Sequence, residues 1–161
     1  MPVLTDDIRR LIDESVLCWL ATSSAEGQPS VSPKEIFAAF GDSIIIANIA
    51  SPGSARNIRD NPRACVSFVN IFTQKGYQVA GRAEMLKASD PDFTDAESAL
   101  LRMTHGNYPF KVVFRVRAEH VKPIIAPKYK LFPDTTESQQ IAGAMIGFTC
   151  SARTRKTTLN G

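Results

Sequence analysis

The stretch SIIIANIASPGSARNIRDNP, residues 43–62, contains an apolar strand that leads directly into the start of a helix. Ser51 or Ser54 suits the helix cap, and Pro52 suits the first turn, where its missing N–H would be unpaired anyway. A helix start presents free N–H donors and the positive end of a dipole, to which Arg56 adds a full charge. The pattern indicates a phosphate-sized anion site, although most capped helix starts bind only water or their own side chains.

Further strands and a few helices are predicted on both sides of this stretch. Apolar runs and alternations indicate strands at 17–22, 29–40, 43–49, 64–72, 77–86 and 111–125. Caps and amphipathic patterns indicate helices at 5–16, about 52–60, about 90–105 and 136–146. Six strands in antiparallel order with few helices between them predict a β-barrel decorated by helices.

The length of 161 residues suits one domain and is too short for two independent cores. We expect a single domain over 1–161, with a core at about 5–146 and a mobile tail at 147–161. No segment approaches the ~18 to 20 apolar residues that span a bilayer, and no secretory signal opens the chain, so we expect a cytoplasmic protein without a membrane partner. Its three cysteines, Cys18, Cys65 and Cys150, are expected to be thiols rather than disulfides or metal ligands.

A net charge of +3 by itself could suggest nucleic acid. Much of this charge lies in the tail, in Arg153, Arg155 and Lys156, without interleaved aromatic residues. Because basic stripes and stacking platforms are missing, we expect no nucleic-acid partner.

Several kinds of active site are disfavoured by missing motifs. The sequence has no G-x-S-x-G, and neither histidine has a Ser or Cys at a motif spacing, which disfavours a hydrolase. The glycine motifs of Rossmann and P-loop proteins are absent as well. A polar cluster at residues 28–35 remains, in which Ser32, Pro33 and Lys34 could face a polar ring, and a cation there would stabilise a reduced flavin. Alternatively, Lys34 is a solvated strand residue paired with Glu35 or another neighbour.

The order of these elements resembles the pyridoxamine 5'-phosphate oxidase-like FMN-binding split-barrel family over about residues 5–125. The likeness is carried by Leu20-Ala21-Thr22, Gly27-Gln28-Pro29, Ser32-Pro33, the apolar strand, Ser51 to Asn57 and Asn61-Pro62. It implies an α+β, mainly β fold, a six-stranded antiparallel split β-barrel, in a homodimer with FMN at the interface.

The resemblance also implies a set of cofactor-binding residues. The phosphate end of FMN would be bound by Asn48, Ser51, Ser54, Arg56 and Asn57. The ring would be lined by Ser32, Pro33 and Lys34, and the partner subunit would contribute Gln74, Lys75 and Gly76. Many members carry Lys or Arg three residues before Asn57, where this chain has Ser54, so Arg56, Lys34 or backbone N–H groups must meet the phosphate charge.

The function expected from the sequence is an FMN-binding flavoprotein that performs a redox reaction on a small molecule. The alternative is a non-catalytic FMN-binding or electron-transfer protein. No catalytic residue and no metal site is assigned. Pyridoxamine phosphate oxidation itself is not transferred, because no convincing match to the substrate-binding residues of those enzymes is present.

Overall fold

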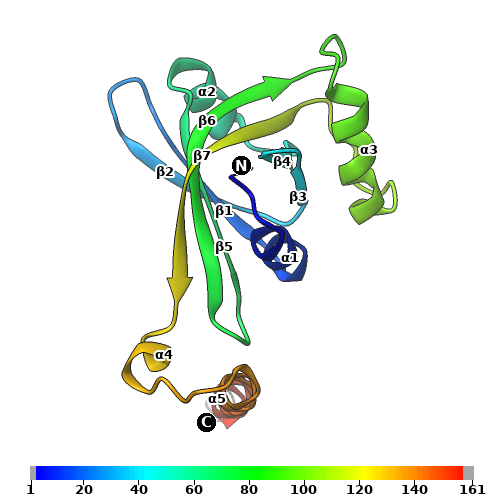
Figure 1. Ribbon diagram of the computed structural model, residues 1–161. Helices are drawn as coiled ribbons and strands as arrows, with labels where there is room; N and C mark the ends of the chain where they lie inside the picture. The colour runs from blue at the N-terminus through cyan, green and yellow to red at the C-terminus, as the bar shows by residue number, and fades with distance from the viewer. Residues whose placement is uncertain (1–2, 158–161) are drawn as a thin grey trace.

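A computed structural model describes residues 3–157 of the chain and the side chains of residues 3–148. Seven antiparallel strands form one curled sheet, with helices around it (Figure 1). The strands are β1 Cys18–Ser23, β2 Pro29–Lys34, β3 Phe37–Phe40, β4 Ser43–Ala47, β5 Arg63–Asn70, β6 Lys75–Leu86 and β7 Val113–Ile125. The helices are α1 Asp6–Glu14, α2 Pro52–Asp60, α3 Phe93–Thr104, α4 Pro127–Leu131 and α5 Glu137–Thr157.

The strand order is β2-β1-β5-β6-β7-β4-β3, which confirms the split-barrel class but corrects the predicted count of six strands to seven. The predicted strand 29–40 is two strands, because β2 pairs with β1 at one edge and β3 pairs with β4 at the other. The chain bends at Glu35 and Ile36 as it passes from one edge to the other. Pro29 and Pro33 lack N–H donors and suit β2, which has a neighbour on one side only.

Two apolar clusters hold the helices on the sheet. The first joins α1 to the sheet interior, where Ile8, Leu11 and Ile12 pack with buried residues such as Leu20 and Phe68. Thr5 caps α1, as its hydroxyl oxygen accepts from the Ile8 N–H. The second cluster lies under α3 and contains Ile45, Ala47, Phe93, Ala96, Leu100 and Val113. All five residues of β4 are buried, so this strand forms part of the wall between the two clusters.

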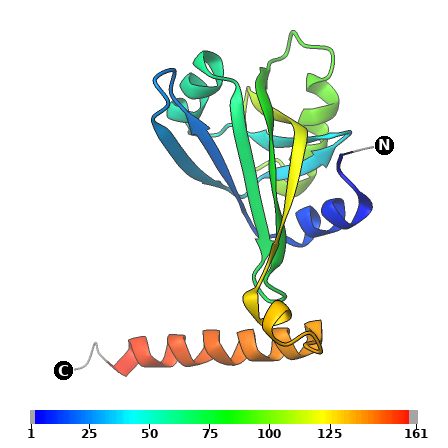
Figure 2. The same ribbon diagram turned by 60° about the vertical axis from the view of Figure 1, so that its left-hand side comes forward.

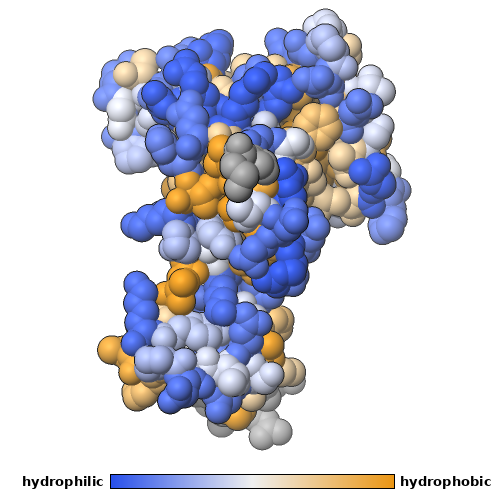
Figure 3. Space-filling view, viewed as in Figure 1, coloured by the Kyte–Doolittle hydropathy of each residue, from blue (hydrophilic) through white to orange (hydrophobic). Residues whose placement is uncertain are grey.

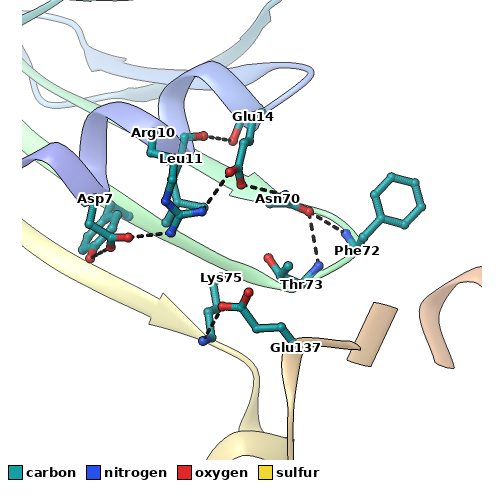
Figure 4. A network of polar contacts seen from close by, with 11 residues as sticks. Asp7, Arg10, Leu11, Glu14, Asn70, Phe72, Thr73, Lys75 and Glu137 are labelled. Carbon is teal, nitrogen blue, oxygen red and sulfur yellow. Dashed lines mark hydrogen bonds and ion pairs between the residues drawn. The ribbon is translucent and has the colours of Figure 1, made fainter. Parts of the chain in front are cut away.

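A polar network ties α1 to the β5–β6 hairpin (Figure 4). Asp7 accepts from the Tyr77 hydroxyl at 2.7 Å and pairs with Arg10 at 2.5 Å. Arg10 also pairs with Glu14 at 2.8 Å, and Glu14 accepts from the Asn70 amide at 3.1 Å. Each of these charged groups therefore has a partner of opposite charge or a hydrogen-bond donor.

After β7 the chain leaves the sheet and forms α4 and α5, and α5 extends away from the sheet (Figure 2). The predicted capping box is confirmed, since Thr136 and Gln139 exchange hydrogen bonds at 3.0 and 3.2 Å. The helix does not end at residue 146 but continues to Thr157. The side chains of Cys150, Arg153, Arg155 and Lys156, and residues 158–161, lie outside the described part. Within residues 3–157, none of the helices has the length and apolar character needed to cross a membrane.

Candidate functional site

The main cavity has a volume of about 710 Å³ and is lined by three segments of the chain. Residues 32–36 line one side, where β2 bends toward β3, and residues from the end of β4 to the start of α2 line another. The third side is the end of α3 and the loop after it, with Met103, Thr104, His105, Asn107 and Tyr108. Cavities of 300–1,000 Å³ are typical of small-molecule sites, so this one is large enough for a cofactor.

Lys34 is the buried cation of this cavity. The residue is only 8 % exposed, and its ammonium donates a short hydrogen bond to the hydroxyl oxygen of Ser51. Burial lowers the pKa of Lys34 below its ordinary value. Glu35 is exposed, and no ion pair of Lys34 occurs among the described residues, so the interpretation of Lys34 as a solvated partner of Glu35 is wrong.

The residue behind Lys34 is uncharged. Cys18 lies opposite Lys34 in the β1–β2 register and is fully buried. Burial raises the pKa of the Cys18 thiol to about 12, so the thiol is protonated at neutral pH and supplies no counter-charge. The positive charge of Lys34 is therefore balanced by no anionic group in the described protein, and an anionic ligand would supply the missing charge.

The start of α2 brings Ser51 to Lys34. Asn48 holds this turn, because its side-chain oxygen accepts from the Ser51 N–H at 3.2 Å. The Ser51 hydroxyl makes no cap hydrogen bond to α2 and is turned to Lys34 instead. A β-carbon at Gly53 would meet no atom within 4 Å, so the first turn of α2 is open on that side. The Lys34 ammonium and the Ser51 hydroxyl both belong to the cavity lining, and both are donors that suit an anionic group such as phosphate.

The other residues predicted on α2 lie differently. Ser54 is buried, and Arg56 is exposed. Asn57 donates its amide hydrogen to the Thr22 hydroxyl oxygen at 3.0 Å, which joins α2 to β1. Among the residues predicted to bind phosphate, Ser51 is the one that lines the cavity. The roles of Asn48, Ser54, Arg56 and Asn57 in binding stay predictions.

The residues predicted to line the ring, Ser32, Pro33 and Lys34, all line the cavity as one continuous segment. Gln74 and Lys75 are elsewhere, at the tip of the β5–β6 hairpin beside α4 and α5 (Figure 1). Lys75 pairs there with Glu137 at 2.8 Å, and its ammonium lies 4.7 Å from the centre of the Tyr129 ring. Within one chain these two residues are therefore not part of the cavity.

The loop after α3 was missed as part of the site. The sequence predicted only that a helix ends near residue 105, and it does end there, but His105 and Gly106 both have positive φ, at 48° and 77°. This left-handed turn brings His105 and Tyr108 to the cavity. A non-glycine residue with positive φ is uncommon and marks a constrained backbone, yet no sequence signal distinguishes it from an ordinary helix end.

Comparison with known proteins gives one family and one fold. The family described as Pyridoxamine 5'-phosphate oxidase matches residues 4–125. No curated protein sequence matches the chain. A variant of HupZ from Group A Streptococcus has a TM-score of 0.64 and 24% identity, covering 75% of this chain and 99% of that one.

Two further solved structures have the same fold and different ligands in their names. The heme storage protein HutZ from Vibrio cholerae has a TM-score of 0.61 and 18% identity, over 76% of this chain and 94% of that one. An FMN-binding protein from Syntrophomonas wolfei subsp. wolfei has a TM-score of 0.59 and 19% identity, over 76% and 87%. At these identities the likeness shows the fold alone.

Proposed function

Since the chain belongs to the pyridoxamine 5'-phosphate oxidase family, we propose that it binds FMN in the cavity around Lys34 and performs a redox reaction on a small molecule. The observation that carries this proposal is the buried ammonium of Lys34 beside Ser51 at the start of α2. A buried charge without a counter-ion is costly, and such groups cluster at functional sites. An anionic cofactor would satisfy it.

The chain's own residues would then bind and orient the cofactor. FMN supplies the electron-transfer chemistry when it is bound. Ser51, at the start of α2, meets the phosphate end, Ser32 and Pro33 lie along the ring, and Lys34, bonded to Ser51, lies between the two. The apolar part of the lining, such as Ile36 and Ile49, excludes water from the ring face.

We propose further that the protein is a homodimer with FMN at the interface. The support is the exposed outer face of β1 and β2, where Trp19 and Val31 are both exposed and lie on the same side of the paired strands. Exposed apolar sheet surface is typical of protein–protein contacts. In such a dimer, Gln74 and Lys75 of one subunit reach the cofactor of the other.

Two alternatives use the same cavity. A non-catalytic FMN-binding or electron-transfer protein needs the same anchoring residues but no substrate. Haem is favoured by one specific observation, the presence of His105 among the residues that line the cavity, because histidine is a common protein ligand of haem iron. HutZ, a heme storage protein by name, shares this fold.

An absorption spectrum of the purified protein tests the cofactor. Bound flavin gives bands at about 370 and about 450 nm, and we expect these bands in the protein as isolated or after incubation with FMN. A colourless protein that takes up no FMN would overturn the proposal. A Soret band after incubation with hemin, lost in His105→Ala, would favour haem instead.

Turnover separates an enzyme from a carrier. The FMN-loaded protein is reduced anaerobically with NADH or NADPH and then mixed with candidate acceptors. We expect rapid, repeated reduction and reoxidation for an oxidoreductase. Stable FMN binding with negligible turnover would favour the non-catalytic alternative.

A further inference from the structure

The C-terminal extension, residues 126–157, lies beyond the part of the chain that the family covers. The family match ends at residue 125, the last residue of β7. HupZ is covered over 99% of its length by 75% of this chain, which leaves a quarter of the chain outside that shared fold. The extension consists of α4, α5 and the residues that connect them, and Figure 2 shows it at the end of the sheet.

The extension is anchored to the tip of the β5–β6 hairpin. The Ala126 N–H donates to the Gln74 carbonyl at 3.1 Å, and the Tyr129 hydroxyl donates to the Thr73 carbonyl at 2.8 Å. Glu137 pairs with Lys75 at 2.8 Å. The Phe72 and Phe148 rings meet edge to face at 6.2 Å between centres. These contacts fix the extension to residues 72–75. Any partner that contacts this hairpin tip therefore lies close to the extension as well.

The extension exposes several large apolar side chains among polar ones. Leu131, Phe132 and Ile146 are each more than 60% exposed. Figure 3 shows apolar side chains over α4 and α5 at the lower end of the molecule. Large apolar side chains that are exposed together on one segment favour a contact with a partner.

The rim of the cavity carries a second exposed apolar surface. Ile49, Met103 and Tyr108 line the cavity and are each more than 40% exposed. Figures 1 and 2 both place the extension at one end of the sheet and α2 and α3 toward the other. The two apolar surfaces of one chain therefore cannot cover each other within that chain.

We infer that the extension of one subunit packs on the cavity rim of a second copy of the chain. In a two-fold dimer this contact occurs twice, because each subunit supplies one extension and one rim. The inference rests on the proposed function for one point, the dimer in which Gln74 and Lys75 reach the partner's cofactor. The extension is bonded to Gln74 and Lys75. In such a dimer it therefore lies beside the partner's cavity and covers the apolar rim of that cavity.

Two differently tagged chains test this contact in the full-length protein. One carries Tyr108→Cys and the other Ile146→Cys, both with Cys65→Ala and Cys150→Ala, while buried Cys18 is kept. After co-expression, the chains are treated with a short bis-maleimide and separated by denaturing gel. We expect a cross-linked product that carries both tags. A matched pair, Tyr108→Cys with Arg82→Cys, should give none, because exposed Arg82 lies on β6 and not on the extension.

The outcomes separate this inference from the proposed function, because FMN uptake and size-exclusion chromatography are measured in parallel on the protein without these substitutions. FMN uptake by a dimer that does not cross-link would overturn the inference alone. Cross-linking without any FMN uptake would support the inference and overturn the proposed cofactor. A monomer would overturn both the inference and the dimer.

A substitution on the extension gives an independent readout. Ile146→Glu places a charge where we expect apolar contact with the partner, and we expect the Kd for FMN to rise roughly five- to tenfold, as for one lost apolar contact. The control, Ser138→Glu, adds the same charge to an exposed polar position of α5 and should leave the Kd unchanged. Equal Kd values for Ile146→Glu and Ser138→Glu would count against the contact.

Discussion

Charged side chains are arranged in opposite ways at the hairpin network and at the cavity. In the network of Figure 4, Asp7, Arg10 and Glu14 are all partly exposed, and each is paired. Lys34 in the cavity is buried, and its hydrogen-bond partner is the neutral hydroxyl of Ser51. Exposed pairs contribute little and cost little, whereas a buried charge without a counter-ion is expensive. The comparison separates the charges that serve the fold from the one for which we propose a ligand.

The pKa shifts of the two regions follow the same division. In the network, the Tyr77 hydroxyl bond and then Arg10 lower the pKa of Asp7, so the folded state favours its charged form. In the cavity, burial lowers the pKa of Lys34, so the folded state disfavours its charged form. An anionic ligand would reverse the shift of Lys34, because an opposite charge nearby favours the ammonium.

The largest effect should come from Gly76→Ala, which disturbs the backbone pairing of β5 and β6 next to the hairpin network. Gly76 lies between Lys75 and Tyr77, and a β-carbon there would overlap the Phe68 carbonyl oxygen on the neighbouring strand. Because the obstacle is backbone, we expect the free energy of unfolding to fall by about 3 kcal/mol. Urea unfolding followed by circular dichroism measures this change.

A glycine beside the cavity provides the control for Gly76. A β-carbon at Gly53 meets open space, so Gly53→Ala should leave the stability of the protein unchanged or slightly higher. Equal unfolding midpoints for Gly76→Ala and the unsubstituted protein would show that β5 and β6 can move apart at little cost.

The second effect in size is a loss of FMN affinity in Lys34→Met. A charge-assisted hydrogen bond contributes about 2 kcal/mol, so we expect the Kd to rise about thirtyfold. The stability of the ligand-free protein should stay the same or increase, because methionine is similar in length to lysine but places no charge in the buried site. Quenching of FMN fluorescence gives the Kd, and thermal unfolding gives the stability.

Arg10→Met makes the same substitution at a paired, exposed charge of the hairpin network. Arg10 is half exposed and paired with Asp7 and Glu14, so its loss should lower stability slightly and leave the Kd for FMN unchanged. If Lys34→Met destabilised the free protein as a lost ion pair does, and left the Kd unchanged, Lys34 would belong with the structural charges.

The sequence predicted the elements well where local signals are strong. The Thr5 cap and the capping box of Thr136 and Gln139 are short-range hydrogen-bond patterns, and both are confirmed. The crossing at Glu35 and Ile36 could not be predicted, because it has no glycine or proline and depends on the pairing of β2 and β3 with distant strands.

The candidate site was predicted in part for a similar reason. Ser32, Pro33, Lys34 and Ser51 belong to two segments with their own motifs, and the cavity unites them. The side that contains His105 and Tyr108 is brought in by α3, through tertiary packing that no local pattern encodes. Whether a residue of α2 reaches the cavity also depends on the direction of its side chain, since Asn57 faces Thr22 and Arg56 faces solvent.

The smallest effect concerns the pH dependence of the network. The pKa of Asp7 is lowered in the folded state, so its stabilising contribution is fully present above the ordinary pKa of 3.8. This contribution is lost as the pH falls through the folded-state value, because the protonated carboxyl no longer favours the folded state. Asp7→Asn should therefore be less stable than the unsubstituted protein at pH 7, by a few tenths of a kcal/mol for so exposed a group.

The difference between Asp7→Asn and the unsubstituted protein should shrink as the pH falls below 3.8. Thermal unfolding midpoints across the acidic range measure it, with Asp13→Asn as the control, since it removes a carboxylate from the same helix without touching the Tyr77 bond. A difference that stays constant with pH would mean that the amide and the carboxylate serve Tyr77 equally well. The hairpin network would then depend on hydrogen bonding rather than on charge, and the contrast with Lys34 would be one of burial alone.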